Sequence, residues 1–305
     1  MLIFVLFIVI FILIFFSGCC YCYWYAFMRD PKRQSGEYEV PPSAYRNKVI
    51  GNILNLMQTP FEDVEITSHD SLRLYGRYYH FKDGAPVVIM MHGYRSNSFR
   101  DGSGGFKIAR EYGLNVLMPD QRAHGKSGGS SITFGIKERH DCAGWVNYVI
   151  HRFGSDTKII LVGLSMGAAT VMMASDIVPK ENVKGIVADC GFSSPEEILK
   201  EVAKQMNYPV GLSYFFLKIG ARLFAGFDIE EYTCRDSLKN TEIPILFIHG
   251  EADSFVPCHM SLSCHEVCTS AKELFTVKNA THGTSYYLDT PGYTASVTNF
   301  LDRVL

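Results

Sequence analysis

Residues 159–169 read Ile-Ile-Leu-Val-Gly-Leu-Ser-Met-Gly-Ala-Ala, and this stretch decides the fold. The β-branched run Ile159–Val162 predicts a buried strand, and the helix formers of Met166–Met173 predict a helix directly after it. Between them, Gly163–Gly167 has the pattern G-x-S-x-G, in which a strand turns sharply into a helix. The turn strains the backbone at Ser165, so its neighbours must be small. We therefore expect the Ser165 hydroxyl to stand clear of the sheet at a helix N-terminus, where negative charge is stabilised.

Strands and helices alternate on both sides of this turn. From Val87 onward the alternation predicts βαβ units and a parallel sheet, so the fold class is α/β. An antiparallel hairpin is expected before it, and ligands in such sheets bind at the carboxyl ends of the strands. The predicted elements are a helix at Tyr45–Met57, the hairpin at Asp63–Ser68 and Leu72–Phe81, strands at Pro86–Gly93, Asn115–Asp120, Val183–Asp189, Ile243–Gly250 and Glu273–Val277, and helices near Phe106–Tyr112, Lys137–Phe153 and Tyr293–Val304.

One connection is too long for a simple crossover. Gly191 to Thr241 spans about fifty residues, whereas a βαβ crossover needs roughly a dozen. It contains a predicted helix at Pro195–Gln205 and the apolar run Val210–Phe227. We interpret residues 192–242 as a small helical cap over Ser165, inserted in a domain that spans 61–305. An ordinary helix with an irregular start is the alternative.

The first 28 residues differ from the rest of the chain. They are almost entirely apolar and carry no charged side chain before Arg29, and tyrosines and a tryptophan precede Arg29, Lys32 and Arg33. This order is typical of a transmembrane helix with an aromatic belt and a basic flank, and the flank favours a cytoplasmic body. A cleaved signal peptide, or a lipoprotein signal ending at Phe16–Cys19, are the alternatives. Residues 29–60 are expected to form a linker and a short helix.

Nine cysteines are spread through the 305 residues without the spacing of a disulfide framework, so free and mostly buried thiols are expected. The group Cys258, His259, Cys264, His265 and Cys268 contains potential metal ligands, but its spacing matches no tetrahedral zinc pattern. We interpret the group as packing residues and expect neither a metal nor a cofactor. The net charge is −2 and no basic stripe is present, so a nucleic-acid partner is not expected.

A serine hydroxyl needs a base within hydrogen-bond reach, and the base needs an acid that orients it. Asp253 follows the buried strand that ends in His249–Gly250, and His282 lies in a loop after the last predicted strand. The chain order Ser, Asp, His is one of the known orders of such triads. Glu251 and Asp189 are rival acids. His92 and His124 also stand at strand ends, where we expect them to support loops by hydrogen bonds.

Acyl transfer also needs N–H donors for the negative charge that develops on the carbonyl oxygen. Met166 N–H, at the start of the predicted helix, is one candidate. The second should come from the loop after the strand Val87–Met91, and we choose Tyr94 N–H. The Tyr94 ring either contacts the substrate or packs.

These motifs together resemble the α/β-hydrolase superfamily over roughly residues 64–305. The motifs that carry the resemblance are His92-Gly93-Tyr94, Asp120 to Ser127, Gly163 to Gly167, His249 to Pro257 and His282-Gly283. Within the superfamily the chain is similar to bacterial membrane-anchored serine hydrolases, which resemble both lysophospholipase-like esterases and prolyl-oligopeptidase-like peptidases. The resemblance implies an eight-stranded, mostly parallel sheet whose second strand is antiparallel. It also implies Ser165 as nucleophile, Asp253 as acid and His282 as base.

The first function hypothesis is a serine hydrolase that cleaves carboxylic esters through an acyl-enzyme. The apolar N-terminus and cap favour a small-molecule or lipid-like acyl ester, such as a monoacylglycerol or lysophospholipid. A peptidase or amidase on the same triad is the second hypothesis, although no acidic pair is evident that would grip a free amine. A binding protein without catalysis is the third, because a fold alone does not guarantee an activity.

Overall fold

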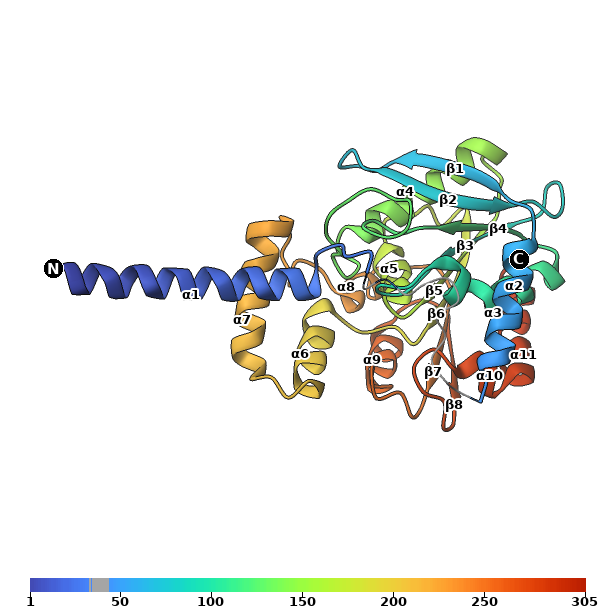
Figure 1. The fold of residues 1–305 in the computed structure, drawn as a ribbon. Helices are drawn as coiled ribbons and strands as arrows, with labels where there is room; N and C mark the ends of the chain where they lie inside the picture. The colour runs from blue at the N-terminus through green and yellow to red at the C-terminus, as the bar shows by residue number, and fades with distance from the viewer. Residues whose placement is uncertain (33, 35–43) are drawn as a thin grey trace.

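The computed structural model describes residues 1–32, 34 and 44–305, so Arg33 and most of the expected linker, including Pro41 and Pro42, lie outside the described residues. Eight strands form one sheet in the order β1-β2-β4-β3-β5-β6-β7-β8 (Figure 1). Their bounds are β1 (Glu62–Thr67), β2 (Arg73–Tyr79), β3 (Val87–Met91), β4 (Asn115–Pro119), β5 (Ile159–Leu164), β6 (Val183–Asp189), β7 (Ile245–Gly250) and β8 (Lys272–Val277). β2 is antiparallel to both β1 and β4, and β3 to β8 are parallel. The expected hairpin and sheet are confirmed.

The helices cover the sheet on both faces, and one apolar core lies under each layer. Trp145 of α4 and Met172 of α5 belong to one core, and Phe106 of α3 and Phe300 of α11 belong to the other. Strand β3 is buried along its whole length, as a parallel strand covered on both faces should be. The helices are α1 (Leu2–Ala26), α2 (Arg46–Gln58), α3 (Ser98–Tyr112), α4 (Glu138–Phe153), α5 (Met166–Ala174), α6 (Pro195–Gln205), α7 (Val210–Gly220), α8 (Cys234–Leu238), α9 (His259–Val267), α10 (Ser285–Leu288) and α11 (Thr290–Val304), with a π-helical segment η1 (Ala221–Ala225) after α7.

Helix α3 is longer than its sequence pattern predicts. It begins at Ser98, eight residues before Phe106, although Gly102, Gly104 and Gly105 lower its helix propensity. Its start is capped, because the Asn97 side chain accepts a hydrogen bond from Arg100 N–H. Burial of one face of the helix then outweighs the glycines. The expected boundary near Phe106 was therefore wrong.

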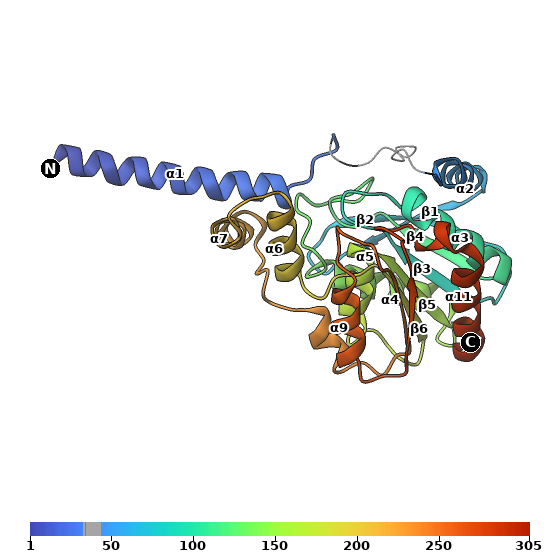
Figure 2. The same ribbon diagram turned by 90° about the horizontal axis from the view of Figure 1, so that it is seen from below.

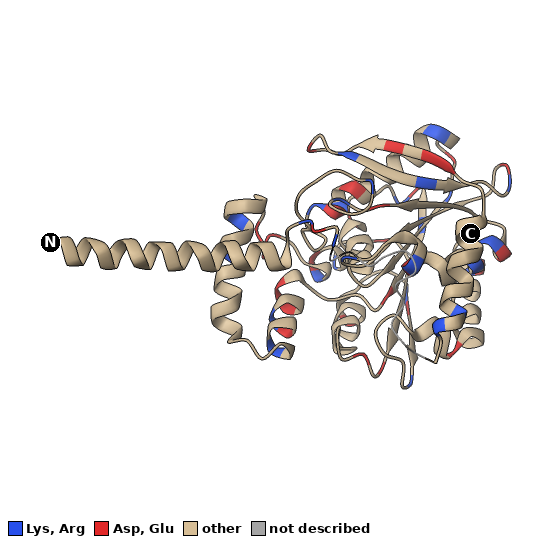
Figure 3. Cartoon of the chain, in the orientation of Figure 1, with Lys and Arg blue, Asp and Glu red and all other residues tan. Residues whose placement is uncertain are grey.

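Helix α1 projects from the body of the molecule that the sheet and its covering helices form, and α6 and α7 lie beside the inner end of α1 (Figures 1 and 2). Its 25 residues are long and apolar enough to cross a membrane by length and composition, with a mean hydropathy of 3.2 over its most apolar window. No charged residue lies on it, whereas charges are scattered over the body (Figure 3). Large side chains before Phe16 are mostly exposed, but Cys19, Ala26 and Phe27 are buried. Helix α1 therefore has an exposed outer part, up to Phe16, and an inner part, from Gly18 to Ala26, that packs against the rest of the molecule.

The segment expected to form a cap divides into two parts. Helices α6 and α7 and segment η1 lie next to α1, away from the sheet (Figure 2). Helix α8 instead packs on α5, where Cys234 Sγ lies 3.6 Å from Ala169 O and Ser237 Oγ donates to Met172 O at 2.6 Å. The residues 192–242 that we expected to form one cap are therefore divided between a part beside α1, from α6 to η1, and a part on the body, α8.

Candidate active site

Ser165 lies at the junction of β5 and α5, in a sharp turn. Its φ of 56° and ψ of −115° are strained for a residue with a side chain. A Cβ atom on Gly163 would lie 2.2 Å from Gly167 O, and one on Gly167 would lie 2.0 Å from Met91 O. Only glycine fits at either position, which explains the G-x-S-x-G spacing physically. The turn holds Ser165 at the N-terminus of α5, as the sequence predicts.

The structure brings Ser165, His282 and Asp253 together from three loops. His282 Nε2 lies 3.0 Å from Ser165 Oγ, and His282 Nδ1 lies 2.7 Å from Asp253 Oδ2. With its proton on Nδ1, the imidazole donates to the carboxylate and accepts from the serine hydroxyl. This is the arrangement in which a histidine can take the proton of a serine that attacks a carbonyl.

Asp253 is held in a fixed position in the loop after β7. Its Oδ1 accepts hydrogen bonds from Phe255 N–H and Val256 N–H, both at 2.9 Å, and its side chain is fully buried. Burial alone would raise the pKa of Asp253, but the neighbouring His249 and His282 rings outweigh it and lower the pKa below its usual range. The carboxylate is therefore ionised at neutral pH.

Sequence reasoning missed the part played by His249. This fully buried side chain on β7 donates from Nε2 to Val256 O at 2.9 Å, and the same nitrogen lies 3.4 Å from Asp253 Oδ2. It therefore braces the loop that carries Asp253. Its position four residues before Asp253, at the end of the same strand, was the available signal.

The rival acids have other partners. Glu251 accepts a hydrogen bond from Thr276 Oγ1 at 2.8 Å, on the exposed side of the loop. Asp189 is buried at the end of β6 and accepts from Tyr293 Oη at 3.0 Å. Burial raises the pKa of Asp189 to about 6. Of the three acids, Asp253 is the one hydrogen-bonded to His282.

The loop after β3 lies next to Ser165, and hydrogen bonds to Asp101 hold it in place. Asp101 Oδ2 accepts from Gly93 N–H at 2.7 Å, and its Oδ1 accepts from Ser96 Oγ at 2.7 Å. Tyr94 and Met166, the two expected donor residues, both line the cavity beside Ser165. Met166 is the first residue of α5, so its N–H has no partner one turn earlier in the helix.

The two histidines expected to support loops do so. His92 Nε2 accepts from Gln121 N–H at 3.0 Å, and His124 Nε2 accepts from Arg95 N–H at 2.9 Å. Burial lowers the pKa of His124, so its ring is neutral and Nε2 is free to accept. Both rings therefore brace the loop that carries Tyr94 rather than take part in a proton relay.

The remaining cysteine-rich group lies away from this site, on and around α9. Cys264 and Cys268 are buried, and the His265 ring packs edge-on against Phe247 with centroids 5.6 Å apart. These contacts are those of packing residues. All nine cysteines of the chain are free, and six of them are buried.

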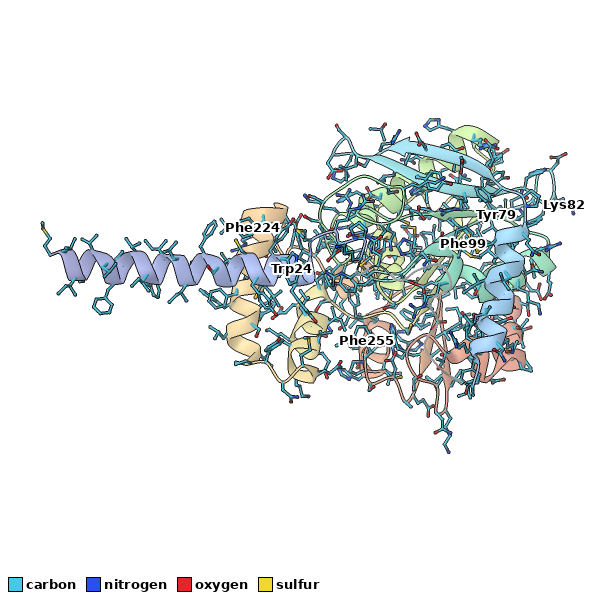
Figure 4. All side chains as sticks on the ribbon, viewed as in Figure 1. Trp24, Tyr79, Lys82, Phe99, Phe224 and Phe255 are labelled. Carbon is cyan, nitrogen blue, oxygen red and sulfur yellow. The ribbon has the colours of Figure 1, made fainter. Side chains whose placement is uncertain are left out.

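Two cavities meet at Ser165. One, the apolar chamber, has a volume of about 320 Å³ and lies between Ser165, the inner part of α1, α6 and α7. The other, the polar cavity, has a volume of about 480 Å³ and is lined by His282, Asp101, Asp189 and a group of threonines and tyrosines. Tyr94, Ser165 and Phe255 border both. Phe255 lies between α6 and the body (Figure 4), with its ring centroid 5.0 Å from that of His282.

Comparison with known proteins agrees with this fold. A family model described as the alpha/beta hydrolase fold matches residues 86–227. YqkD of Bacillus subtilis is 27% identical over 254 residues, which are 80% of this chain and 82% of YqkD. A membrane protein of Saccharomyces cerevisiae, YNL320W, is 23% identical over 197 residues, which are 63% of this chain and 62% of that protein.

Solved structures of the Pyrococcus furiosus esterase Pf2001 are also similar. One crystal form superposes with a TM-score of 0.69 at 24% identity, covering 91% of this chain and 98% of the esterase. A second form gives a TM-score of 0.67 at 26% identity, covering 82% and 95%. The chain therefore has the α/β-hydrolase fold, which is the fold that its sequence motifs led us to expect.

Proposed function

We propose that this chain is a serine hydrolase that cleaves carboxylic esters, with Ser165 as nucleophile, His282 as base and Asp253 as orienting acid. The observation that carries the proposal is the hydrogen-bonded series Ser165 Oγ, His282 and Asp253 beside a chamber lined with apolar side chains. The similarity to the esterase Pf2001, at 26% identity, supports ester rather than amide substrates.

The proposed reaction uses only groups of this chain and water. Ser165 Oγ attacks the ester carbonyl carbon while His282 Nε2 takes the hydroxyl proton, and the carbonyl oxygen becomes an oxyanion. N–H groups of Tyr94 and Met166 stabilise that charge. His282 then gives the proton to the leaving alcohol, and the acyl group remains on Ser165. Water, deprotonated by His282, attacks the acyl-enzyme; the acyl–Oγ bond breaks, the acid is released, and His282 returns the proton to Ser165 Oγ, while Asp253 stays ionised and holds the ring.

We also propose that α1 anchors the protein in a membrane. At 1.5 Å per residue a bilayer core of about 30 Å needs about 20 helical residues, and Leu2–Tyr21 supplies them without a charged side chain. Tyr21 ends this stretch, and Tyr23, Trp24 and Tyr25 follow at the level where aromatic residues prefer to lie. Trp24 lies where α1 reaches the body (Figure 4).

Hydrolysis of p-nitrophenyl butyrate by the purified full-length protein in detergent tests the catalytic proposal. We expect activity in the wild type, loss of nearly all of it in Ser165→Ala, and no change in Ser155→Ala, which removes an exposed serine hydroxyl on another loop. Equal activity of the wild type and Ser165→Ala would contradict the proposal. Cleavage of short peptides but not of esters would favour the peptidase hypothesis instead.

A further inference from the structure

The inner part of α1 forms one side of the cavity next to Ser165. Gly18, Tyr21, Cys22, Tyr25 and Ala26 line the apolar chamber, at the helical spacing of one face of α1. The opposite side of the chamber reaches Ser165 and Met166. None of the described residues that line it carries a charge. A membrane helix used only as a tether would not supply a side of the substrate cavity.

Close packing fixes α1 against α7. A Cβ atom on Gly18 would lie 2.9 Å from the Phe216 ring, and a Cβ atom on Gly220 would lie 2.7 Å from Cys19 O. Such small residues let two helices approach closely. Phe224 of η1 adds ring contacts with Phe16 and Tyr23, with centroids 5.5 and 5.3 Å apart (Figure 4).

The C-terminal end of α1 is also bonded to the loop that carries the proposed oxyanion donor. Tyr94 Oη donates to Ala26 O at 2.9 Å, and Arg95 Nη2 donates to Tyr25 O at 2.6 Å. These carbonyls belong to the last turn of α1, whose acceptors have no partner within the helix. The position of α1 is therefore coupled to the position of Tyr94.

The length of α1 determines where the chamber lies relative to the membrane. If Leu2–Tyr21 spans the hydrocarbon core, then Gly18 to Cys22 lies at the membrane surface, and so does the chamber beside it. Helix α7 crosses α1 there and runs across its direction (Figures 1 and 2), with Leu212 and Phe215 exposed. An apolar face exposed on a helix in the plane of the interface is typical of a helix that rests on lipid.

We propose that the inner part of α1 and helices α6 and α7 together form an acyl-binding chamber, which takes the single long acyl chain of a membrane-resident ester directly from the bilayer. The inference rests on the proposed esterase function and adds its substrate class. The ester carbonyl then lies at Ser165, and the alcohol part of the substrate occupies the polar cavity. We infer one acyl chain rather than two because, among the described residues, the chamber is the one apolar cavity that borders Ser165.

Two variants of α1 test this assignment in full-length protein reconstituted in phosphatidylcholine vesicles. Cys22→Trp places a large side chain in the chamber, whereas Cys20→Trp makes the same change two residues away, at a position that does not line it. The readout is the ratio of kcat/KM for p-nitrophenyl dodecanoate to that for p-nitrophenyl acetate. We expect the ratio to fall about tenfold or more in Cys22→Trp and to stay at the wild-type value in Cys20→Trp.

A second pair of variants addresses the helix crossing. Gly220→Leu pushes α7 away from α1, whereas Gly211→Leu adds the same side chain to α7 where a Cβ atom meets nothing within 4 Å. We expect the dodecanoate-to-acetate ratio to fall in the first and not in the second. If neither Cys22→Trp nor Gly220→Leu lowers the ratio, or if both lower the two rates equally, the chamber assignment is overturned while the esterase proposal stands. A folded wild type that hydrolyses neither ester overturns both.

Discussion

The two cavities that meet at Ser165 differ in chemistry and in origin. The polar cavity is built from loops at the carboxyl ends of the strands, and it holds acids, threonines and tyrosines. The apolar chamber is built from α1, α6 and α7, which lie outside the sheet and its covering helices. Under the two proposals above, the body supplies the reacting groups, and the added helices supply the surface that selects the acyl group. Substitutions in groups common to both cavities should affect all esters equally, and those in one cavity should not.

The largest effect is expected from His282→Ala, which removes the base that both cavities share. Without it Ser165 Oγ has no proton acceptor, and kcat for acetate and dodecanoate esters should fall together by about 10⁴-fold or more. His151→Ala, an exposed histidine on α4, is the matched control. Steady-state kinetics on p-nitrophenyl esters measure the effect, and circular dichroism verifies the fold. A loss confined to the dodecanoate ester would contradict the assignment of His282 as a base that serves both cavities.

Asp253→Asn should give the next largest loss, and it also decides between the rival acids. The amide cannot stabilise the imidazolium that forms when His282 takes the proton, so kcat should fall by about 10³- to 10⁴-fold for both esters. Glu251→Gln keeps an acceptor for Thr276 and should leave kcat close to the wild type. Similar losses in the two variants would count against the assignment of Asp253.

Asp101→Asn tests the side of the polar cavity that positions the oxyanion loop. The variant replaces one of the two carboxylate oxygens that hold Gly93 N–H and Ser96 Oγ, so Tyr94 N–H moves out of place. We expect kcat to fall about 10- to 100-fold for both esters, with KM little changed. Glu111→Gln, an exposed acid on the same helix, should have no effect. A raised KM with normal kcat would mean that Asp101 contacts substrate instead.

The smallest effect on catalysis is expected from Asp189→Asn, which tests the buried acid of the polar cavity through stability. Burial raises the pKa of Asp189 to about 6, whereas an unfolded aspartate titrates near 3.9. Between about pH 4 and 6 the folded state thus holds a proton that the unfolded state has released. This contribution to the free energy of unfolding is present below about pH 4 and is lost as the pH rises to 6, by about 3 kcal/mol at most.

The amide introduced by Asp189→Asn does not titrate, so the free energy of unfolding of this variant minus that of the wild type should increase between pH 4 and 7. Urea unfolding in mild detergent at several pH values measures this difference, in which the titration of all other groups largely cancels. Parallel pH curves for the two proteins would show that Asp189 is ionised in the folded state throughout this range.

The sequence predicts the body of the molecule far better than the added helices. The meeting of Ser165, Asp253 and His282 could be predicted because strand ends in a parallel sheet lie at one edge, so residues far apart in the chain become neighbours there. Helix α6 was predicted with its bounds as found, Pro195–Gln205, because Ser194 and Pro195 mark its start. His249 was missed because a buried histidine in a strand looks like any other packing residue.

The apolar chamber could not be predicted either, and the physical reason differs from that for His249. Residues 1–26 carry no charged side chain, and the aromatic residues near the end of α1 look like an interfacial belt, so the sequence does not reveal that Gly18–Ala26 packs against other helices while Leu2–Phe16 stays exposed. The distinction depends on where α7 crosses α1, which is a tertiary contact. Gly18 and Gly220 are the marks of that crossing in the sequence, but only the structure pairs them.

Labelling by a fluorophosphonate probe tests the central claim most directly, because the probe reacts covalently with a serine only when a base activates it. The full-length protein, Ser165→Ala and His282→Ala would be treated in parallel, and the modified residue would be located by mass spectrometry. The account predicts labelling of the wild type at Ser165 and none of either variant. A folded wild type that takes up no label, or label that persists in Ser165→Ala, would contradict it.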